Sequence, residues 1–165
     1  TGVGVGLISA GRPVQGVAHG EAGHMRVRRA RGDDFAGACP FHGDCVEGLI
    51  SGPALAKRFG RPAHELPDEG GEWDLFVHDF AGLLHNLVVT AAPERILIGG
   101  GVIASRPGLF PKLRAALAAS IAAYGSLAPY AEQLDTRLGP PGLGTMAGPL
   151  GALAAGLDVL DTADG

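Results

Sequence analysis

The sequence predicts an α/β domain with a mixed sheet, and three features of the chain indicate this class. Residues 73–92 and 109–124 carry apolar side chains at the spacing of amphipathic helices. A short apolar, β-branched segment at 95–98 lies between them and is typical of a strand in a parallel sheet. A hairpin-like segment comes before both. The whole chain has 165 residues, which correspond to about one domain and are enough to bury a core.

The first element is expected to be a β-hairpin. Residues 1–10 alternate small and branched side chains, and Gly11-Arg12 separates them from 13–17. Residues 21–47 are polar and Gly-rich, without a helical period. Loops of this length without structure are uncommon, so residues 21–47 are expected to have a function or to be held together by a cross-link such as a bound metal.

The remaining elements follow from periodicity and from Gly and Pro. Helix signals cover 46–59, with a possible break at Gly52-Pro53 and a stop at Gly60, and then a polar linker over 60–72. Pro93 ends the helix 73–92, and the strand 95–98 is expected to be buried. The last predicted elements are a helix at 109–124, a strand at 133–138, a loop at 139–144 and a helix at 146–160.

Composition excludes several classes of protein. With 46% apolar residues, 18% charged residues and a net charge of -4, the chain is typical of a soluble protein, and neither nucleic-acid nor membrane binding is expected. No signal peptide or long apolar span is visible, which predicts the cytoplasm. We interpret one basic cluster as a solvated strand and loop edge: Arg26, Arg28, Arg29 and Arg31.

A candidate zinc site lies in the loop 21–47. Cys39, His42 and Cys45 follow one another at intervals of three, and His24 is the natural fourth ligand, although spacing alone also allows His19. A complete Cys2His2 set is typical of structural zinc. The alternative is a disulfide or two buried thiols with His42 at the surface. The absence of an export signal disfavours the disulfide, and thiols that flank a His in a Gly- and Pro-rich loop are poorly placed for core packing.

Two carboxylates bracket this candidate site, Glu21 before His24 and Glu47 after Cys45. Carboxylates and imidazoles hydrogen-bond polyols, so the pair could bind a sugar. Taken alone, however, the residues favour a plainer interpretation. In this interpretation, Glu47 stabilises the start of a helix by interacting with the helix dipole, and Glu21 is solvated.

Two glycine segments are candidate phosphate or nucleotide contacts, Thr1-Gly2-Val3-Gly4 and Gly99-Gly100-Gly101. Glycine lets backbone N–H groups approach an anion closely. The alternatives are a tightly packed strand and a sharp turn between a strand and a helix. There is no Walker-type motif and no dinucleotide fingerprint.

Taken together, the motifs closely resemble the bacterial ROK family (repressors, open reading frames and kinases), and within it the fructokinase branch. They are Glu21-Ala-Gly-His24-Met25, Cys39-Pro-Phe-His42-Gly-Asp-Cys45-Val-Glu47-Gly48-Leu49 and Ser51-Gly52-Pro53-Ala54. Most of the family has a Cys-x-Cys metal loop, whereas a central His as here is found in the branch that contains the fructokinases. The resemblance implies two actin-like domains of the ribonuclease-H type, with ATP and sugar between them. Residues 1–157 match the C-terminal domain and 158–165 would form a short tail.

The resemblance also implies roles for individual residues. Zinc would be bound by His24, Cys39, His42 and Cys45. Sugar hydroxyls would contact Glu21, His24 and Glu47, although His24 cannot use one ring nitrogen for both tasks. ATP, with Mg²⁺, would contact Thr1, Gly2 and Gly4 as the second phosphate motif, Gly99, Gly100 and Gly101 as the adenosine motif, and Pro53.

One part of the family pattern is absent. The first phosphate motif and the catalytic Asp are expected upstream of Thr1, so the chain is expected to be a fragment that is inactive alone. Asp33, Asp34 and Asp44 are interpreted as loop and turn residues. The complete protein is expected to be a homodimeric, ATP-dependent fructokinase that forms a hexose 6-phosphate, with fructose as its hexose. The alternatives are the effector-binding half of a ROK repressor and a stand-alone zinc-stabilised binding module.

Overall fold

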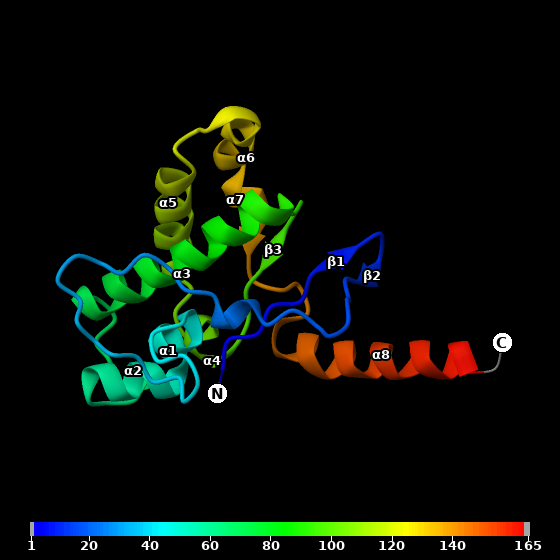
Figure 1. Cartoon of the computed structure of the whole chain (residues 1–165), viewed down its shortest axis with the longest axis horizontal. Helices are drawn as coiled ribbons and strands as arrows, with labels where there is room; N and C mark the ends of the chain where they lie inside the picture. The colour runs from blue at the N-terminus through cyan, green and yellow to red at the C-terminus, as the bar shows by residue number, and fades with distance from the viewer. Residues whose placement is uncertain (1, 164–165) are drawn as a thin grey trace.

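A computed structural model describes residues 2–163, and it shows an α/β chain with a helical core (Figure 1). The predicted hairpin is present but short. Strands β1 (Ile8–Ser9) and β2 (Arg12–Pro13) pair antiparallel, with Ile8 opposite Pro13. Ala10 and Gly11 between them have positive φ angles of 50° and 75°, as the tight turns of two-residue hairpins require.

The predicted break between two helices is confirmed, and Ser51 is its cause. Helix α1 spans Val46–Ile50 and α2 spans Gly52–Phe59. Ser51 has extended backbone angles, and its Oγ accepts a hydrogen bond from the Ala54 N–H at 3.3 Å, which caps α2. Gly60 ends α2 in the left-handed conformation, as predicted.

The core lies mainly between two long helices, α3 (Gly71–Ala91) and α5 (Leu109–Ile121), which pack against each other. Both were predicted, although α5 ends before Tyr124. Helix α1 packs on α3 from the other side. The side chains that fill this core are apolar and almost completely buried, among them Val46, Leu49, Trp73, Phe76, Leu84, Leu113 and Leu117. The loop 21–47, which carries the candidate metal ligands and is called the metal loop below, is therefore attached to a rigid helical base.

The second strand pair differs from the prediction in two ways. Strand β3 (Ile96–Leu97) pairs parallel with β4 (Leu138–Gly139), so the parallel direction is confirmed. However, Leu97 is 61% exposed and the strand is not buried on both faces. Within residues 2–163 the two strand pairs form separate two-stranded sheets, not one mixed sheet.

The strand predicted at 133–138 is wrong for most of its length. Residues Leu134–Arg137 form helix α7, and only Leu138 joins β4. Leu134 and Leu138 are both buried. A spacing of four places two residues on one side of a helix and also on one face of a strand. The remaining short elements are η1 (Ala22–His24), η2 (Ala63–Glu65), α4 (Gly101–Ala104), η3 (Gly125–Leu127), α6 (Ala128–Glu132) and η4 (Gly144–Met146).

The last helix, α8 (Ala147–Ala163), extends away from the rest of the molecule (Figure 1). It continues through much of the predicted tail 158–165. An exposed apolar stripe recurs at intervals of three and four residues from the preceding turn along α8, and it consists of Leu143, Met146, Leu150, Leu153 and Leu157. No helix in the described part of the chain is long and apolar enough to cross a membrane.

Candidate functional site

The loop that holds the candidate metal ligands is folded by backbone hydrogen bonds. Cys39 and Gly43 form an antiparallel bridge, with N–H to carbonyl distances of 3.1 and 3.0 Å, which reverses the chain around His42. The Ala38 N–H donates to the Gly48 carbonyl at 2.8 Å. At Gly48 a Cβ atom would overlap the Gly43 carbonyl oxygen, so this turn can pack against α1 only with glycine there.

His24, Cys39, His42 and Cys45 come together as the sequence predicted. Their four ligand atoms all lie within 4.8 Å of one another. His24 Nδ1 is 3.4 Å from Cys45 Sγ and 3.7 Å from Cys39 Sγ, and His42 Nδ1 is 3.8 Å from Cys39 Sγ. Tetrahedral zinc with N and S ligands requires ligand atoms roughly 3.3–3.8 Å apart. The residues therefore fit a zinc ion in donor type and in spacing.

The two thiols are suited to metal binding and are not joined to each other. Cys39 and Cys45 are both free and buried. Burial alone would raise the pKa of the Cys39 thiol, but the backbone N–H groups of Phe41 and His42 stabilise its thiolate, and its pKa lies below the ordinary value. Burial raises the pKa of Cys45. A thiolate is the form that binds zinc.

His24 and His19 differ in their position relative to the two cysteines. His24 ends the 3₁₀ turn η1, in the cluster. His19 lies outside it, with Nε2 2.7 Å from Glu21 Oε1 in an exposed ion pair. The Val46 N–H donates to the Met25 carbonyl at 2.9 Å, which holds η1 against the start of α1.

Glu47 links the candidate metal centre to the first glycine segment. The Val3 N–H donates to Glu47 Oε2 at 3.0 Å. A Cβ at Gly2 would lie 2.7 Å from the same oxygen, and a Cβ at Gly23 would overlap the Val3 carbonyl. The segment around Val3 is therefore packed between η1 and α1. Glu47 is also in the first turn of α1, where a carboxylate interacts favourably with the helix dipole.

Comparisons with known proteins identify the family of this chain. A model of the ROK family matches residues 1–157. The chain belongs to the ROK family. It is 40% identical over 153 residues to a fructokinase of Pediococcus pentosaceus, and 37% identical over 153 residues to a putative fructokinase of Bacillus subtilis. Each match covers 93% of this chain and 51% of the relative, so the chain spans about half the length of these relatives.

A solved structure shows the same fold. The crystal structure of a ROK hexokinase from Thermus thermophilus superimposes with a TM-score of 0.72 at 27% identity. The match covers 98% of this chain and 56% of that chain. The ROK membership and the sugar kinase relationship predicted from the motifs are thus confirmed.

The other residues of this ROK domain that the sequence predicted to bind sugar or nucleotide are not part of the His/Cys cluster. Glu21 has a 63% exposed side chain and precedes η1. Pro53 lies exposed in the first turn of α2. Gly99, Gly100 and Gly101 form the turn from β3 into α4, and Gly100 has a φ of 103°. Gly4 has open space around it. Thr1 lies outside the described residues.

Sequence reasoning missed a buried charge network behind the metal loop. Asp33, interpreted as a loop residue, has a side chain only 6% exposed and accepts hydrogen bonds from Arg29 at 2.5 Å and from Arg58 at 2.6 Å. Arg58 also donates to the completely buried Asp79 at 2.9 Å. The solvated interpretation is therefore wrong for Arg29, whose side chain is 22% exposed. It holds for Arg26, which is 68% exposed and pairs with Asp44.

This network connects the metal loop to α2 and α3. Burial opposes ionisation of Asp33, but the hydrogen bonds from Arg29 and Arg58 outweigh it and hold the Asp33 pKa below its usual value. Such ion pairs separated by more than 20 residues leave no periodic signal in the sequence.

Proposed function

We propose that this chain is the sugar- and nucleotide-binding half of an ATP-dependent fructokinase. The complete enzyme transfers the γ-phosphoryl group of Mg-ATP to a hexose, with fructose as the preferred sugar, and forms a hexose 6-phosphate. The names of the relatives from Pediococcus pentosaceus and Bacillus subtilis support this substrate. No observation favours the repressor or the stand-alone module, so neither is carried further.

The observation that carries the proposal is the orientation of His24. Its Nδ1 faces both sulfur atoms, at 3.4 and 3.7 Å. A zinc ion there would fix the imidazole and leave Nε2–H as a hydrogen-bond donor. One histidine would thus serve the metal with one nitrogen and a sugar hydroxyl with the other. Such a zinc would be structural, because four protein ligands leave no open position for a reacting water.

Glu47 and Glu21 complete the proposed sugar-facing set. Glu47 Oε2 accepts from Val3, and in the described part of the chain no hydrogen bond is made by Oε1. That oxygen is therefore free to accept a hydrogen bond from a sugar hydroxyl. Among residues 2–163, the Glu21 side chain is held by its exposed contact with His19, which a sugar can replace at low cost.

The nucleotide is proposed to bind the two glycine segments. Gly99, Gly100 and Gly101 follow the carboxyl end of the parallel strand β3, which is where ligands bind in open α/β sheets. Thr1, Gly2 and Gly4 would contact phosphate next to Glu47, and Pro53 would lie beside the nucleotide. The hydrogen bond from the Val3 N–H to Glu47 would then join the proposed phosphate-binding segment to the proposed sugar-binding residues.

Catalysis is proposed to require a second domain. Asp33, Asp34 and Asp44 do not match the base position implied by the family resemblance. Phosphoryl transfer depends on positioning from both sides of a cleft. The exposed stripe on α8 supports a covering partner, since its Leu153 is 60% and its Leu157 53% exposed. The catalytic Asp and the first phosphate motif would belong to that second domain, and the complete enzyme would be a cytoplasmic homodimer.

The proposal is tested by assaying the complete gene product for ATP-dependent phosphorylation of fructose, mannose and glucose. We expect turnover with fructose and none from residues 1–165 alone. Glu47→Gln should lower kcat/KM for fructose at least about tenfold, because a charge-assisted hydrogen bond to the sugar is lost. The matched change Glu69→Gln in the exposed linker should have no effect. Absence of turnover with all three hexoses would contradict the kinase assignment.

A further inference from the structure

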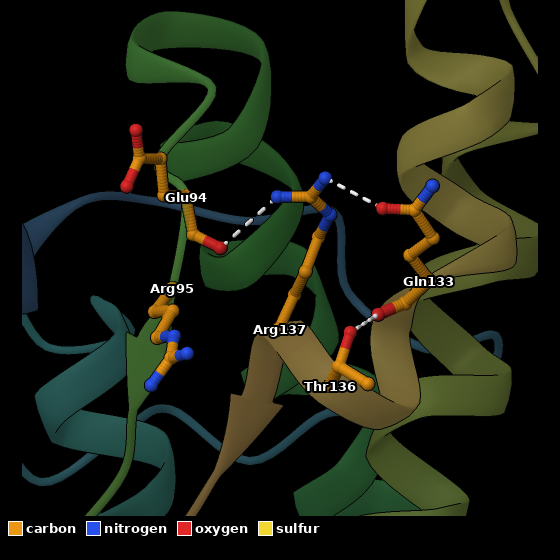
Figure 2. Close-up of a pocket in the computed structure, with 5 residues that line it drawn as sticks. All are labelled: Glu94, Arg95, Gln133, Thr136 and Arg137. Carbon is orange, nitrogen blue, oxygen red and sulfur yellow. Dashed lines mark hydrogen bonds between the residues drawn. The ribbon is translucent and has the colours of Figure 1, made fainter.

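A hollow lies at the opposite end of β3 from Gly99–Gly101. It has a volume of about 350 Å³ and is lined by Glu94, Arg95, Gln133, Thr136 and Arg137 (Figure 2). The parallel register pairs Ile96 with Leu138. Because Arg95 and Arg137 immediately precede these residues, the two arginines occupy neighbouring positions at the amino ends of the strands.

The charge of Arg137 is held in place by neutral groups. Its guanidinium donates to the Glu94 backbone carbonyl at 3.1 Å and to Gln133 Oε1 at 2.7 Å. It also lies over the Tyr130 ring, 5.0 Å from the centroid. Within residues 2–163, no carboxylate forms an ion pair with Arg95 or Arg137. A partly buried cation without a counter-ion is costly, and a bound anion would offset that cost.

Two side chains around the hollow, Arg95 and Gln133, keep unused donors, while Glu94 contributes a carboxylate. Arg95 is exposed and, among the described residues, makes no side-chain hydrogen bond. The Gln133 amide oxygen accepts from Arg137, which leaves its NH2 group as a donor. The Thr136 hydroxyl donates to the Gln133 carbonyl at 3.0 Å. Figure 2 shows the Glu94 carboxylate turned away from the Arg137 guanidinium.

From this geometry we propose that the hollow between Arg95 and Arg137 binds the phosphate group of a small phosphorylated molecule. Arginine is the side chain best suited to phosphate oxygens, because its guanidinium offers several fixed N–H donors. Gln133 adds a neutral donor from the adjacent turn. The ligand would enter at the far end of β3, so this site is distinct from the nucleotide contacts proposed above and does not depend on them.

Isothermal titration calorimetry at low ionic strength tests the site, with inorganic phosphate, fructose 6-phosphate and fructose as probes. We expect both phosphate compounds to bind and fructose not to compete with them. Arg95→Gln should raise the Kd for phosphate about tenfold, as expected for loss of a charged hydrogen-bond donor. Glu94→Gln should lower that Kd, because it removes a neighbouring negative charge.

Arg61→Gln is the matched control. Arg61 is also exposed, so this substitution removes the same charge from another part of the surface. An equal loss of affinity in Arg61→Gln and Arg95→Gln would overturn the proposal, since it would show a general charge effect. Loss of phosphate binding in Glu47→Gln but not in Arg95→Gln would also overturn it, because the ion would then lie at the sugar-facing site. Arg95→Gln changes an exposed side chain, so its fold can be checked by an unchanged circular dichroism spectrum.

Discussion

The Val3 N–H lies 3.0 Å from Glu47 Oε2, and this one bond joins the first glycine segment to the first turn of α1, directly after the last metal ligand. A carboxylate that accepts a backbone N–H is oriented without the use of its second oxygen. The same contact fixes the strand-like segment that would approach phosphate. The loop 21–47, the Glu47 carboxylate and the glycine segment around Val3 are therefore joined mechanically into one unit, whatever ligands they are proposed to bind.

Removing this carboxylate should loosen the unit. Glu47→Ala leaves the partly buried Val3 N–H without its acceptor, and we expect the free energy of unfolding to fall by about 1–3 kcal/mol. Glu47→Gln keeps an amide oxygen that can accept the same bond, so its loss should be smaller. Urea denaturation of the zinc-loaded proteins measures both values. Equal losses would mean that the Val3 bond contributes nothing.

Close packing behind Val3 gives a second prediction. A Cβ at Gly23 would overlap the Val3 backbone carbonyl, which cannot move aside as a flexible side chain could. Gly23→Ala should therefore lower the free energy of unfolding by about 1–3 kcal/mol. Gly4→Ala is the control, because nothing lies within 4 Å of a Cβ there. Its effect in the same urea titration should stay within about 0.5 kcal/mol.

The metal assignment predicts a difference between two nearby histidines. His24→Gln removes a ligand atom from the cluster, whereas His19→Gln removes only an exposed partner of Glu21. We expect about one zinc per chain by elemental analysis in the unchanged protein and in His19→Gln. His24→Gln should bind zinc at least about tenfold more weakly in a chelator competition. Weaker zinc binding in His19→Gln, with unchanged binding in His24→Gln, would instead make His19 the ligand.

Different parts of this site were accessible to sequence reasoning for different physical reasons. Cys39, His42 and Cys45 were found because one short loop carries all three donor residues. His24 could not be separated from His19 by spacing, and it needed the backbone position of η1. The network of Arg58 was invisible, because its partners Asp33 and Asp79 are 25 and 21 residues away in the chain.

The elements of the fold also differ in how well the sequence predicted them. Long helices such as α3 were predicted because many turns repeat one pattern. The error at 133–138 arose where only Leu134 and Leu138 carried the signal, and their spacing fits both a helix and a strand. Exposure of Leu97 was not predictable either, since an apolar strand sequence does not reveal which of its faces is covered.

The Asp33 network predicts a pH dependence of stability. The pKa of Asp33 is lower in the folded chain than in the unfolded chain, because Arg29 and Arg58 stabilise the carboxylate against the cost of burial. Its contribution is complete above the unfolded Asp value of about 3.9 and is lost as the pH falls from there through the folded value. Asp33→Asn removes the titrating group, and at pH 7 should cost about 1–3 kcal/mol.

The measurement is the free energy of unfolding of both proteins from pH 7 to pH 2 in the same buffers. Zinc release on acidification affects both proteins, so the difference between them isolates Asp33. That difference should be constant above about pH 5 and should shrink below about pH 4. A difference that does not change with pH would show that Asp33 acts only through packing.

The C-terminal end of α3 offers a stabilising change. Ala92 terminates the helix in the left-handed conformation, with a φ of 39° and a ψ of 55°, and it is exposed. A Cβ in this conformation costs roughly 1 kcal/mol that glycine avoids, so Ala92→Gly should raise the free energy of unfolding by about 0.5–1 kcal/mol. Ala91→Gly, one residue earlier and still helical, should lower it by about 1 kcal/mol because glycine is a poor helix former. The two substitutions remove the same atoms at neighbouring exposed positions. Opposite signs of the change in the free energy of unfolding, measured by urea titration, can therefore only come from backbone conformation. A loss of stability in both variants would mean that Ala92 is not left-handed in solution.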